Sequence, residues 1–446
     1  MNDKSSKLGT QKISKLVIGF SATVLAGLLL SSVYTLTDAL FISRCVGDNA
    51  MGGVSLILPF TIFQGAVSTT VGSGASALVS RKLGEEKPYE AGSITLNAMF
   101  IFYITAVITT ALGFIFMNPM LKILGCTGEL EKYAREYFTI ILAGNIFSTG
   151  FSSIIRAEGR MVYGLLIWVI PISINISLDA LFIMKLSMGV KGSAIATVIC
   201  QFISFSMSVL FFTKFTSQKF KGAKLSLKTV SEIIGIGLPS LIQTGSLSIM
   251  SALFNNSLSK VSGETGINSF AYISKLITFG LSPITAFSTA LVPVAGYSFG
   301  AKQYKRANQA ADFCLRSSII YAISAIALAF IFPEKLIRIF TDSEDIILLA
   351  ANGLRIISFS LLFSSIPMTA GAFYQASGKK AGAFLMFSIT VIFAVPLLYI
   401  LPKYLNLNGV WLSYSLASLL AATVAAAMYF RLKNNNKTEY SKQSSE

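Results

Sequence analysis

Histidine is absent from this sequence, and charged residues are scarce. The missing histidine removes the commonest metal ligand and the commonest general base near neutral pH, so any proton chemistry has to rest on carboxylates. Only 13% of the 446 residues are charged, whereas a soluble protein carries about a quarter. The cysteines lie far apart and form no close pair of the kind that binds zinc or performs redox chemistry. They are Cys45, Cys126, Cys200 and Cys314.

Apolar residues are present in large excess. They make up 53% of the chain, and the mean hydropathy is +0.68. No soluble core needs this much apolar sequence, so the excess is expected to face lipid. The net charge of +16 does not indicate a nucleic-acid partner, because the basic residues fall mainly in short stretches between apolar runs. This arrangement is typical of membrane proteins, in which such residues set the orientation.

Apolar runs long enough to cross about 30 Å of hydrocarbon recur along the whole chain. The twelve predicted spans are residues 16–43, 53–80, 91–117, 137–155, 163–185, 190–213, 233–259, 267–296, 308–332, 352–376, 380–401 and 408–431. The first is too long for a signal peptide and is expected to remain as a helix. Two mixed stretches, Leu121–Arg135 and Glu334–Ala350, predict short helices at the membrane interface. The predicted fold is an all-α membrane protein.

The longest polar stretch divides the chain into two halves. Residues 214–230 carry five lysines and are predicted to be a cytoplasmic linker. They separate an N-terminal lobe, residues 1–213, from a C-terminal lobe, residues 231–446, which ends in a polar tail. If the N-terminus is cytoplasmic, the inside segments hold more than twice as many lysines and arginines as the outside loops. The positive-inside rule therefore predicts a multi-pass protein of the cell membrane with both termini in the cytoplasm.

The two halves resemble each other. Residues 83–87 with Ala91 correspond to residues 299–303 with Ala307, and residues 121–124 correspond to 337–340, all at a shift of 216. Chance similarity between apolar stretches is the alternative, but a common shift at two polar landmarks argues against it. Because each half has an even number of spans, both insert with the same polarity. We therefore expect two pseudo-symmetric six-helix lobes in a parallel repeat, with a cavity between them.

Two acidic residues lie well inside predicted spans: Asp38 in the first and Asp179 in the fifth. An ionisable residue at a helix centre costs about 2.5–3.5 kcal/mol on insertion scales, so such a residue is rarely kept without a function. At the related positions the C-terminal half has Phe254 and, near Pro396, only apolar residues. The predicted site is therefore confined to one lobe.

Depth along the helices groups further oxygen-bearing side chains with these acids. At a rise of 1.5 Å per residue, Asp38, Asn175, Asp179 and Thr197 fall in one layer, roughly 8–17 Å below the outer surface. Two carboxylates in a low-dielectric pocket either share a proton or hold a hard cation such as Na⁺ with help from amide and hydroxyl oxygens. The alternative is structural: an acid could cap a kink or pair with a base. No basic residue lies deep in the N-terminal spans to pair with.

Four more residues are candidates for a substrate cavity. Tyr34, Gln64 and Asn145 fall slightly deeper in the same lobe, although polar residues are also common at helix contacts in membranes. Lys275 is the notable charge of the C-terminal lobe. It lies near the outer end of its span, so its side chain could simply extend to the interface.

Several local sequences together resemble the multidrug and toxic compound extrusion (MATE) family and its bacterial MepA-like branch. Residues 34–42, YTLTDALFI, resemble the first-helix segment with its acid, and 175–183, NISLDALFI, resemble the helix-five motif. Residues 192–197, GSAIAT, are similar to the start of helix six. Residues 156–159, RAEG, and 296–302, GYSFGAK, resemble the loops after helices four and eight.

This resemblance implies twelve helices in two lobes and export of organic cations in exchange for inward H⁺ or Na⁺. It also implies a cation site at Asp38, Asn175, Asp179 and Thr197. One feature departs from the family pattern. The first helix often carries a proline that bends it, whereas residues 21–25 here contain none. Gly27 could still permit bending.

The sequence thus predicts a secondary antiporter that exports amphipathic, cationic drugs or metabolites by alternating access and works as a monomer without a cofactor. The alternative is a flippase for lipid-linked saccharides. A flippase must neutralise a pyrophosphate, which calls for several basic residues in the cavity, and the spans offer mainly Lys275. An intramembrane enzyme is not expected, because HExxH is impossible without histidine and GxSxG is absent from the spans.

Overall fold

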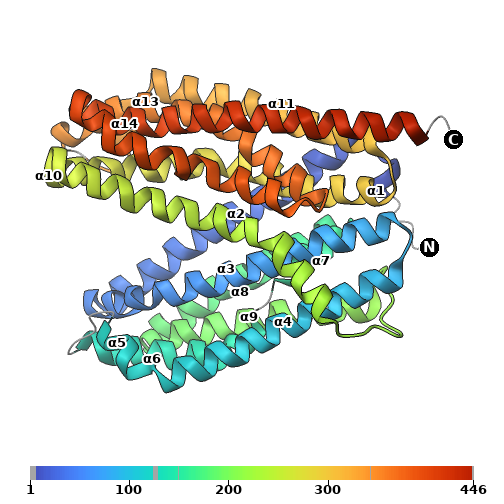
Figure 1. Cartoon of the computed structure of the whole chain (residues 1–446). Helices are drawn as coiled ribbons and strands as arrows, with labels where there is room; N and C mark the ends of the chain where they lie inside the picture. The colour runs from blue at the N-terminus through green and yellow to red at the C-terminus, as the bar shows by residue number, and fades with distance from the viewer. Residues whose placement is uncertain (1–6, 124–128, 149, 342, 444–446) are drawn as a thin grey trace. The chain divides into compact units, whose positions relative to one another are not determined.

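The computed structural model of the protein describes residues 7–123, 129–148, 150–341 and 343–443. Every regular element in these ranges is a helix (Figure 1). Cys126 lies outside the described residues, and so does part of the predicted interfacial stretch Leu121–Arg135. The free cysteines among the described residues are Cys45, Cys200 and Cys314.

The described helices contain eleven segments long and apolar enough to cross a membrane. The last of these, Lys380–Asn436, is two spans, because the helical backbone breaks at Asn406, where φ is 47°. The predicted number of twelve spans is therefore confirmed. The helices that carry them are α2 (Ile13–Cys45), α3 (Asp48–Gly84), α4 (Pro88–Ile115), α6 (Glu129–Gly144) with α7 (Phe151–Ala157), α8 (Met161–Asp179) with η2 (Ala180–Lys185), α9 (Val190–Lys214), α10 (Leu227–Gly300, two spans), α11 (Tyr304–Ile331), α13 (Glu344–Ala376) and α14 (Lys380–Gln443, two spans).

Helix α10 has 74 residues. A straight helix of that length would measure about 110 Å, several times the thickness of a bilayer. It therefore holds two consecutive spans, Leu227–Ser262 and Thr265–Gly300.

The predicted interfacial helices are largely wrong. Among the described residues of these stretches, the short helices are α5 (Met117–Ile123) and α12 (Pro333–Arg338), and a further one-turn helix, α1 (Lys7–Thr10), precedes the first span. The remaining parts, Glu129–Arg135 and Glu344–Ala350, are the first turns of the membrane-spanning helices α6 and α13. Charged residues there extend a spanning helix beyond the hydrocarbon instead of forming a separate one.

Contacts divide the chain into two compact units. Among the described residues, unit 1 consists of those in 23–79 and 87–237, and unit 2 consists of those in 7–22, 80–86 and 238–443. The chain therefore passes from one unit to the other inside α2, α3 and α10. The lobe bounds expected from the sequence, residues 1–213 and 231–446, remain a prediction.

Within unit 2, the ends of α3 and α10 cross closely. A Cβ atom on Gly84 would collide with the backbone oxygen of Tyr297, and one on Gly300 would collide with the backbone oxygen of Arg81. Gly300 lies 216 positions after Gly84, and Tyr297 lies 216 positions after Arg81. The two contacts are therefore related by the same shift that the sequence shows. Glycine at both positions thus allows a symmetric helix crossing, which supports the parallel repeat.

The two units differ in their apolar cores. The core of unit 2 is large and aromatic: Phe254 stacks on Phe270 at 5.1 Å and meets the edge of Tyr414 at 5.5 Å, with Trp411 fully buried beside them. The core cluster of unit 1 packs around Phe138 and borders a group of polar side chains.

Candidate functional site

The candidate site in unit 1 is built from three helices, each of which contributes two polar side chains one turn apart. Residues at i and i+4 lie on the same face of an α-helix. The pairs are Tyr34 and Asp38 on α2, Asn175 and Asp179 on α8, and Ser193 and Thr197 on α9.

Helices α2 and α9 are joined by two hydrogen bonds between these pairs. The Ser193 hydroxyl donates to Asp38 Oδ1 at 2.6 Å, and the Tyr34 hydroxyl lies 3.2 Å from Thr197 Oγ1. Going along α2 from Tyr34 to Asp38, the partner on α9 changes from Thr197 back to Ser193, as expected for antiparallel helices. The short contact to Asp38 is typical of a hydroxyl bonded to a carboxylate.

Helix α8 completes the group. When the Asn175 amide is oriented so that both of its ends are satisfied, its nitrogen donates to Asp179 Oδ2 at 2.8 Å and its oxygen accepts from the Thr197 backbone N–H at 3.3 Å. Asp179 is fully buried, and its Oδ1 has no hydrogen-bond partner among the described residues. A buried carboxylate oxygen without a donor is costly, so Asp179 Oδ1 is free to take up a proton or to ligate a cation.

The backbone changes its winding directly after Asp179. The next six residues, Ala180–Lys185, form the π-helix η2. Such wider turns are rare and occur frequently at functional sites, because the extra residue re-aims the neighbouring side chains.

The oxygen atoms of this group are of the kind that a small, hard cation prefers as ligands. It presents two carboxylates, one amide oxygen and several hydroxyls, which are the ligands that oxygen-seeking cations prefer. No cluster of three or more His, Cys, Asp or Glu side chains, of the kind that holds a transition metal, occurs in the part of the chain that the structure describes. The same two carboxylates can instead take up a proton.

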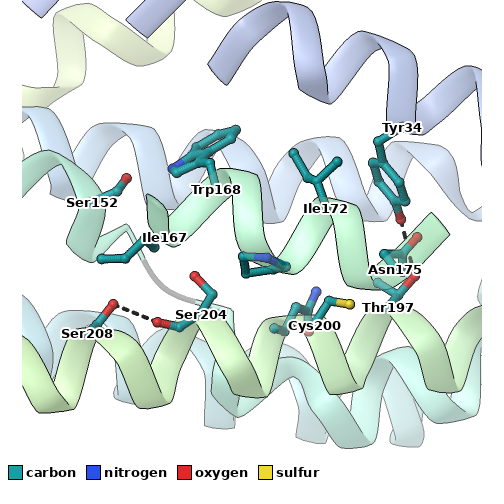
Figure 2. Close-up of a pocket in the computed structure, with 12 residues that line it drawn as sticks. Tyr34, Ser152, Ile167, Trp168, Ile172, Asn175, Thr197, Cys200, Ser204 and Ser208 are labelled. Atoms are coloured by element: carbon teal, nitrogen blue, oxygen red, sulfur yellow. Dashed lines mark hydrogen bonds between the residues drawn. The ribbon is translucent and has the colours of Figure 1, made fainter. Parts of the chain in front are cut away.

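A cavity of about 250 Å³ lies directly beside this polar group and shares three of its residues: Tyr34, Asn175 and Thr197. In Figure 2, Tyr34 points toward Thr197 and Asn175 at one end of the cavity, while Trp168 and Ser152 lie toward the other. The remaining lining residues are Ile167, Pro171, Ile172, Cys200, Gln201, Ser204 and Ser208.

Pro171 contributes to the shape of this cavity. It lies inside α8, where it removes a backbone hydrogen bond to Ile167 and favours a local bend. Both residues line the cavity. Gln201 from α9 also lines it, and its Oε1 is buried without a partner among the described residues. The cavity therefore combines apolar walls with unused polar atoms.

Two of the residues predicted for a substrate cavity lie elsewhere in unit 1. Gln64 and Asn145 line a separate small cavity of about 20 Å³. The Asn145 amide nitrogen is already engaged, lying 2.8 Å from Thr109 Oγ1 and 3.1 Å from Thr110 Oγ1. It ties the segment after α6 to α4, as polar residues at helix contacts commonly do.

Lys275 belongs to unit 2 and lies beside aromatic rings. Its ammonium group is 5.9 Å from the ring centre of Tyr272 and 5.7 Å from that of Phe340, and these two rings stack on each other. The contact is a cation–π interaction. Lys275 does not line the cavity beside the acids.

Ser193 was not among the residues predicted from the sequence. It lies in the GSAIAT segment, and its position one helical turn before Thr197 is the feature that could have placed it in the site. Ser193 is fully buried and bonded to Asp38, so it belongs to the site on geometry alone. The cavity residue Trp168 also escaped notice, because a tryptophan in an apolar span carries no distinguishing pattern.

The chain matches a family model and a set of curated relatives. The MatE family model covers residues 24–181 and 239–400. The multidrug export protein MepA of Staphylococcus haemolyticus is 24% identical over 95% of this chain and 94% of its own length. MepA of Staphylococcus aureus has the same identity and the same two coverages.

Solved structures share the fold. One, an outward-facing multidrug-resistance MATE family transporter of the MOP superfamily, aligns with a TM-score of 0.90 at 23% identity, covering 98% of this chain and 100% of the other. Another, a MOP superfamily transporter from Pyrococcus furiosus, aligns with a TM-score of 0.89 at 22% identity, covering 98% and 99%. At this identity the likeness establishes the architecture of two six-helix lobes.

Proposed function

Because this chain belongs to the MatE family of multidrug efflux transporters, we propose that it exports amphipathic organic cations in exchange for H⁺ or Na⁺ entering the cell. The observation that carries the proposal is the network of Asp38, Asp179, Asn175, Ser193 and Thr197 beside a mixed polar and apolar cavity. The network provides the cation site, and the cavity provides room for cargo.

The network and the cavity share side chains, which couples the two ligands. Tyr34, Asn175 and Thr197 take part in both. When a cation or proton neutralises the carboxylates, their hydrogen bonds rearrange and the shared side chains move. Cargo therefore binds differently before and after the cation is loaded, and only such a difference in affinity can drive export.

The cavity walls suit an aromatic or aliphatic cation. Trp168 and Tyr34 present ring surfaces that attract positive charge, and Ile167 and Ile172 provide apolar area. Loading the two aspartates with an external cation removes their attraction for a cationic cargo. Release of the cargo then accompanies entry of the coupling ion in an alternating-access cycle.

A flippase for lipid-linked saccharides remains the alternative, and the cavity does not favour it. None of its lining residues in the described part of the chain is lysine or arginine, whereas a pyrophosphate requires such groups.

The direct test is transport by the purified protein in proteoliposomes. With a fluorescent organic cation such as ethidium inside, an imposed inward H⁺ or Na⁺ gradient should accelerate its export several-fold over liposomes without a gradient. A rate that is the same with either gradient and with none would contradict coupled antiport.

The two coupling ions can be separated with two variants. Asn175→Ala and Thr197→Ala each remove an oxygen that a metal ion needs and a proton does not. If Na⁺ is the coupling ion, both variants should raise the Na⁺ concentration for half-maximal export by about tenfold; if H⁺ is used, the pH dependence should stay near that of the wild type. Loss of export at saturating concentrations of both ions would contradict a ligand role.

Orientation and assembly complete the proposal: a monomer in the cell membrane with both termini and residues 214–230 in the cytoplasm. Cysteines introduced into the linker should resist a membrane-impermeant maleimide in intact cells and react after permeabilisation. Strong labelling in intact cells would contradict this orientation and place residues 214–230 outside the cell.

A further inference from the structure

Unit 2 carries an open groove that the transport proposal does not use. The groove has a volume of about 560 Å³ and lies between the residues that begin α2 and one face of α11. Its lining residues are Lys12, Ile13, Ser14, Arg306, Gln309, Asp312, Phe313 and Arg316. Along α11, Arg306, Gln309, Asp312 or Phe313, and Arg316 recur at intervals of three or four residues, so they form one continuous stripe.

The groove is strongly basic. Lys12, Arg306 and Arg316 line it, and Asp312 is its one acid among the described residues. That acid is already neutralised: Lys433 Nζ lies 2.6 Å from Asp312 Oδ2, and the Tyr429 hydroxyl donates to Oδ1 at 2.8 Å. The positive charges therefore face the groove without an anion of their own.

The three basic side chains differ in the hydrogen bonds that they form. Arg306 is built in, because it donates to the backbone oxygens of Leu8 and Gln11 and so holds the segment before α2 against α11. In the described part of the chain, the side chains of Lys12 and Arg316 form no hydrogen bond or salt bridge. They are available to a ligand.

The direction of the side chains brings these charges together. Arg316 lies ten residues, about 15 Å, farther along α11 than Arg306. Side chains on a helix lean toward its N-terminus, which for Arg316 is the direction of Arg306, and both residues line the same groove as Lys12. This is how a basic side chain inside a span reaches a polar headgroup.

The groove also has an apolar side, formed by Ile13 and Phe313. A free phosphate ion would bind the basic groups but would leave the side chains of Ile13 and Phe313 exposed to water. An anionic phospholipid satisfies both, because its phosphodiester meets the charges and its acyl chains lie on the apolar residues. Basic pockets beside transmembrane helices are a known way to bind such headgroups.

We propose that this groove, formed by the start of α2 and the Arg306–Arg316 face of α11, binds the phosphodiester headgroup of an anionic phospholipid. The bound lipid bridges α2 to α11 by contacting Lys12 on one side and Arg316 on the other. It therefore stabilises the packing of the first span within unit 2.

The test is a lipid titration of the purified, delipidated protein in detergent. Dioleoylphosphatidylglycerol should raise the midpoint of thermal unfolding in a saturable way. The double variant Lys12→Gln/Arg316→Gln should raise the half-saturating lipid concentration about 25-fold, since each basic group contributes about fivefold. Arg316→Lys keeps the charge and should remain within a few-fold of the wild type.

The controls separate a built site from general surface charge. Lys305→Gln/Lys380→Gln removes two exposed charges from the first turns of α11 and α14 that do not line the groove, and it should titrate like the wild type. Dioleoylphosphatidylcholine and inorganic phosphate should each give no saturable shift. The proposal is overturned if the groove variant titrates like the wild type, if the control pair loses as much, or if phosphatidylcholine or free phosphate protects equally well.

Discussion

Repeat-related positions in the two units have opposite chemistry. Asp38 in unit 1 is bonded to Ser193 beside a polar cavity. The residue 216 positions later, Phe254, is fully buried in unit 2 and packed against Phe270 and Tyr414. The same helix in the repeat thus carries a carboxylate in one unit and an aromatic ring in the other. At this position unit 1 has a hydrogen-bonded carboxylate, and unit 2 has a packed aromatic core.

Charge placement shows the same division. Unit 1 buries Asp179 completely, and one of its carboxylate oxygens has no hydrogen-bond partner in the described part of the chain. In unit 2, Asp312 near the start of α11 is paired with Lys433. An unpaired buried acid is costly and is therefore a candidate functional residue, whereas the contacts of Asp312 with Lys433 and Tyr429 account for that acid structurally. Similar helices therefore do not imply similar roles.

The largest expected effect on stability comes from the aromatic core of unit 2. Phe254→Ala leaves a cavity among Phe270 and Tyr414 and should cost about 3–5 kcal/mol of folding free energy. Asp38→Asn, at the related position in unit 1, keeps shape and a hydrogen-bonding oxygen and should cost about 1 kcal/mol. Thermal unfolding of both proteins in the same detergent measures the difference. Equal losses would mean that the two positions have equivalent structural roles.

The next effect concerns the linker. Glu158, which lies after α7 and outside the spans, is fully buried and accepts from the Thr216 hydroxyl, the Ser217 N–H and the Gln218 amide. Burial raises the pKa of this carboxyl, and the three donors act in the opposite direction.

Glu158→Ala removes the shared acceptor and should loosen the linker by about 1–3 kcal/mol. Trypsin should then cleave at Lys219, Lys221 or Lys224 at least several-fold faster than in the wild type. Glu90→Ala is the matched control, since Glu90 is half-exposed and its ion pair with Lys87 is a surface contact of little energetic value. Unchanged cleavage in the Glu158 variant would show that the linker is held by other contacts.

The smallest effect is expected at Lys275. Its contacts with Tyr272 and Phe340 are worth about 0.5–1 kcal/mol, so Lys275→Met should lower stability slightly and leave export near the wild-type rate. Export and membrane abundance should be measured on the same cells. A variant of normal abundance without export would bring unit 2 into the transport chemistry and weaken the contrast between the units.

Much of this architecture could be predicted from the sequence because the bilayer imposes length and hydropathy. The twelve spans follow from that constraint, and depth along them was enough to select Asp38, Asn175, Asp179 and Thr197. The structure brings Asn175, Asp179 and Thr197 into one hydrogen-bonded group and joins Asp38 to the same helix, α9, through Ser193.

Other features depend on tertiary packing and could not be predicted. Ser193 is one of many serines in the spans, and only its partner distinguishes it. The π-helix after Asp179 leaves no mark in the composition. The stretch Glu344–Ala350 carries two acids and looked interfacial, yet it begins the long helix α13. Asn145 and Gln64 lie at a suitable depth, but on a part of unit 1 that borders a different cavity. Depth alone does not tell which way a side chain points.

The most direct test of the central claim compares matched aspartates in the two units. In proteoliposomes with an imposed cation gradient, Asp38→Asn and Asp179→Asn should each lower gradient-driven export of ethidium at least about 100-fold while the protein remains folded, since coupling needs a carboxylate that can bind and release a cation. Asp312→Asn in unit 2 should retain most of the activity. Wild-type export by both unit 1 variants, or an equal loss in the unit 2 variant, would contradict the assignment of coupling to unit 1.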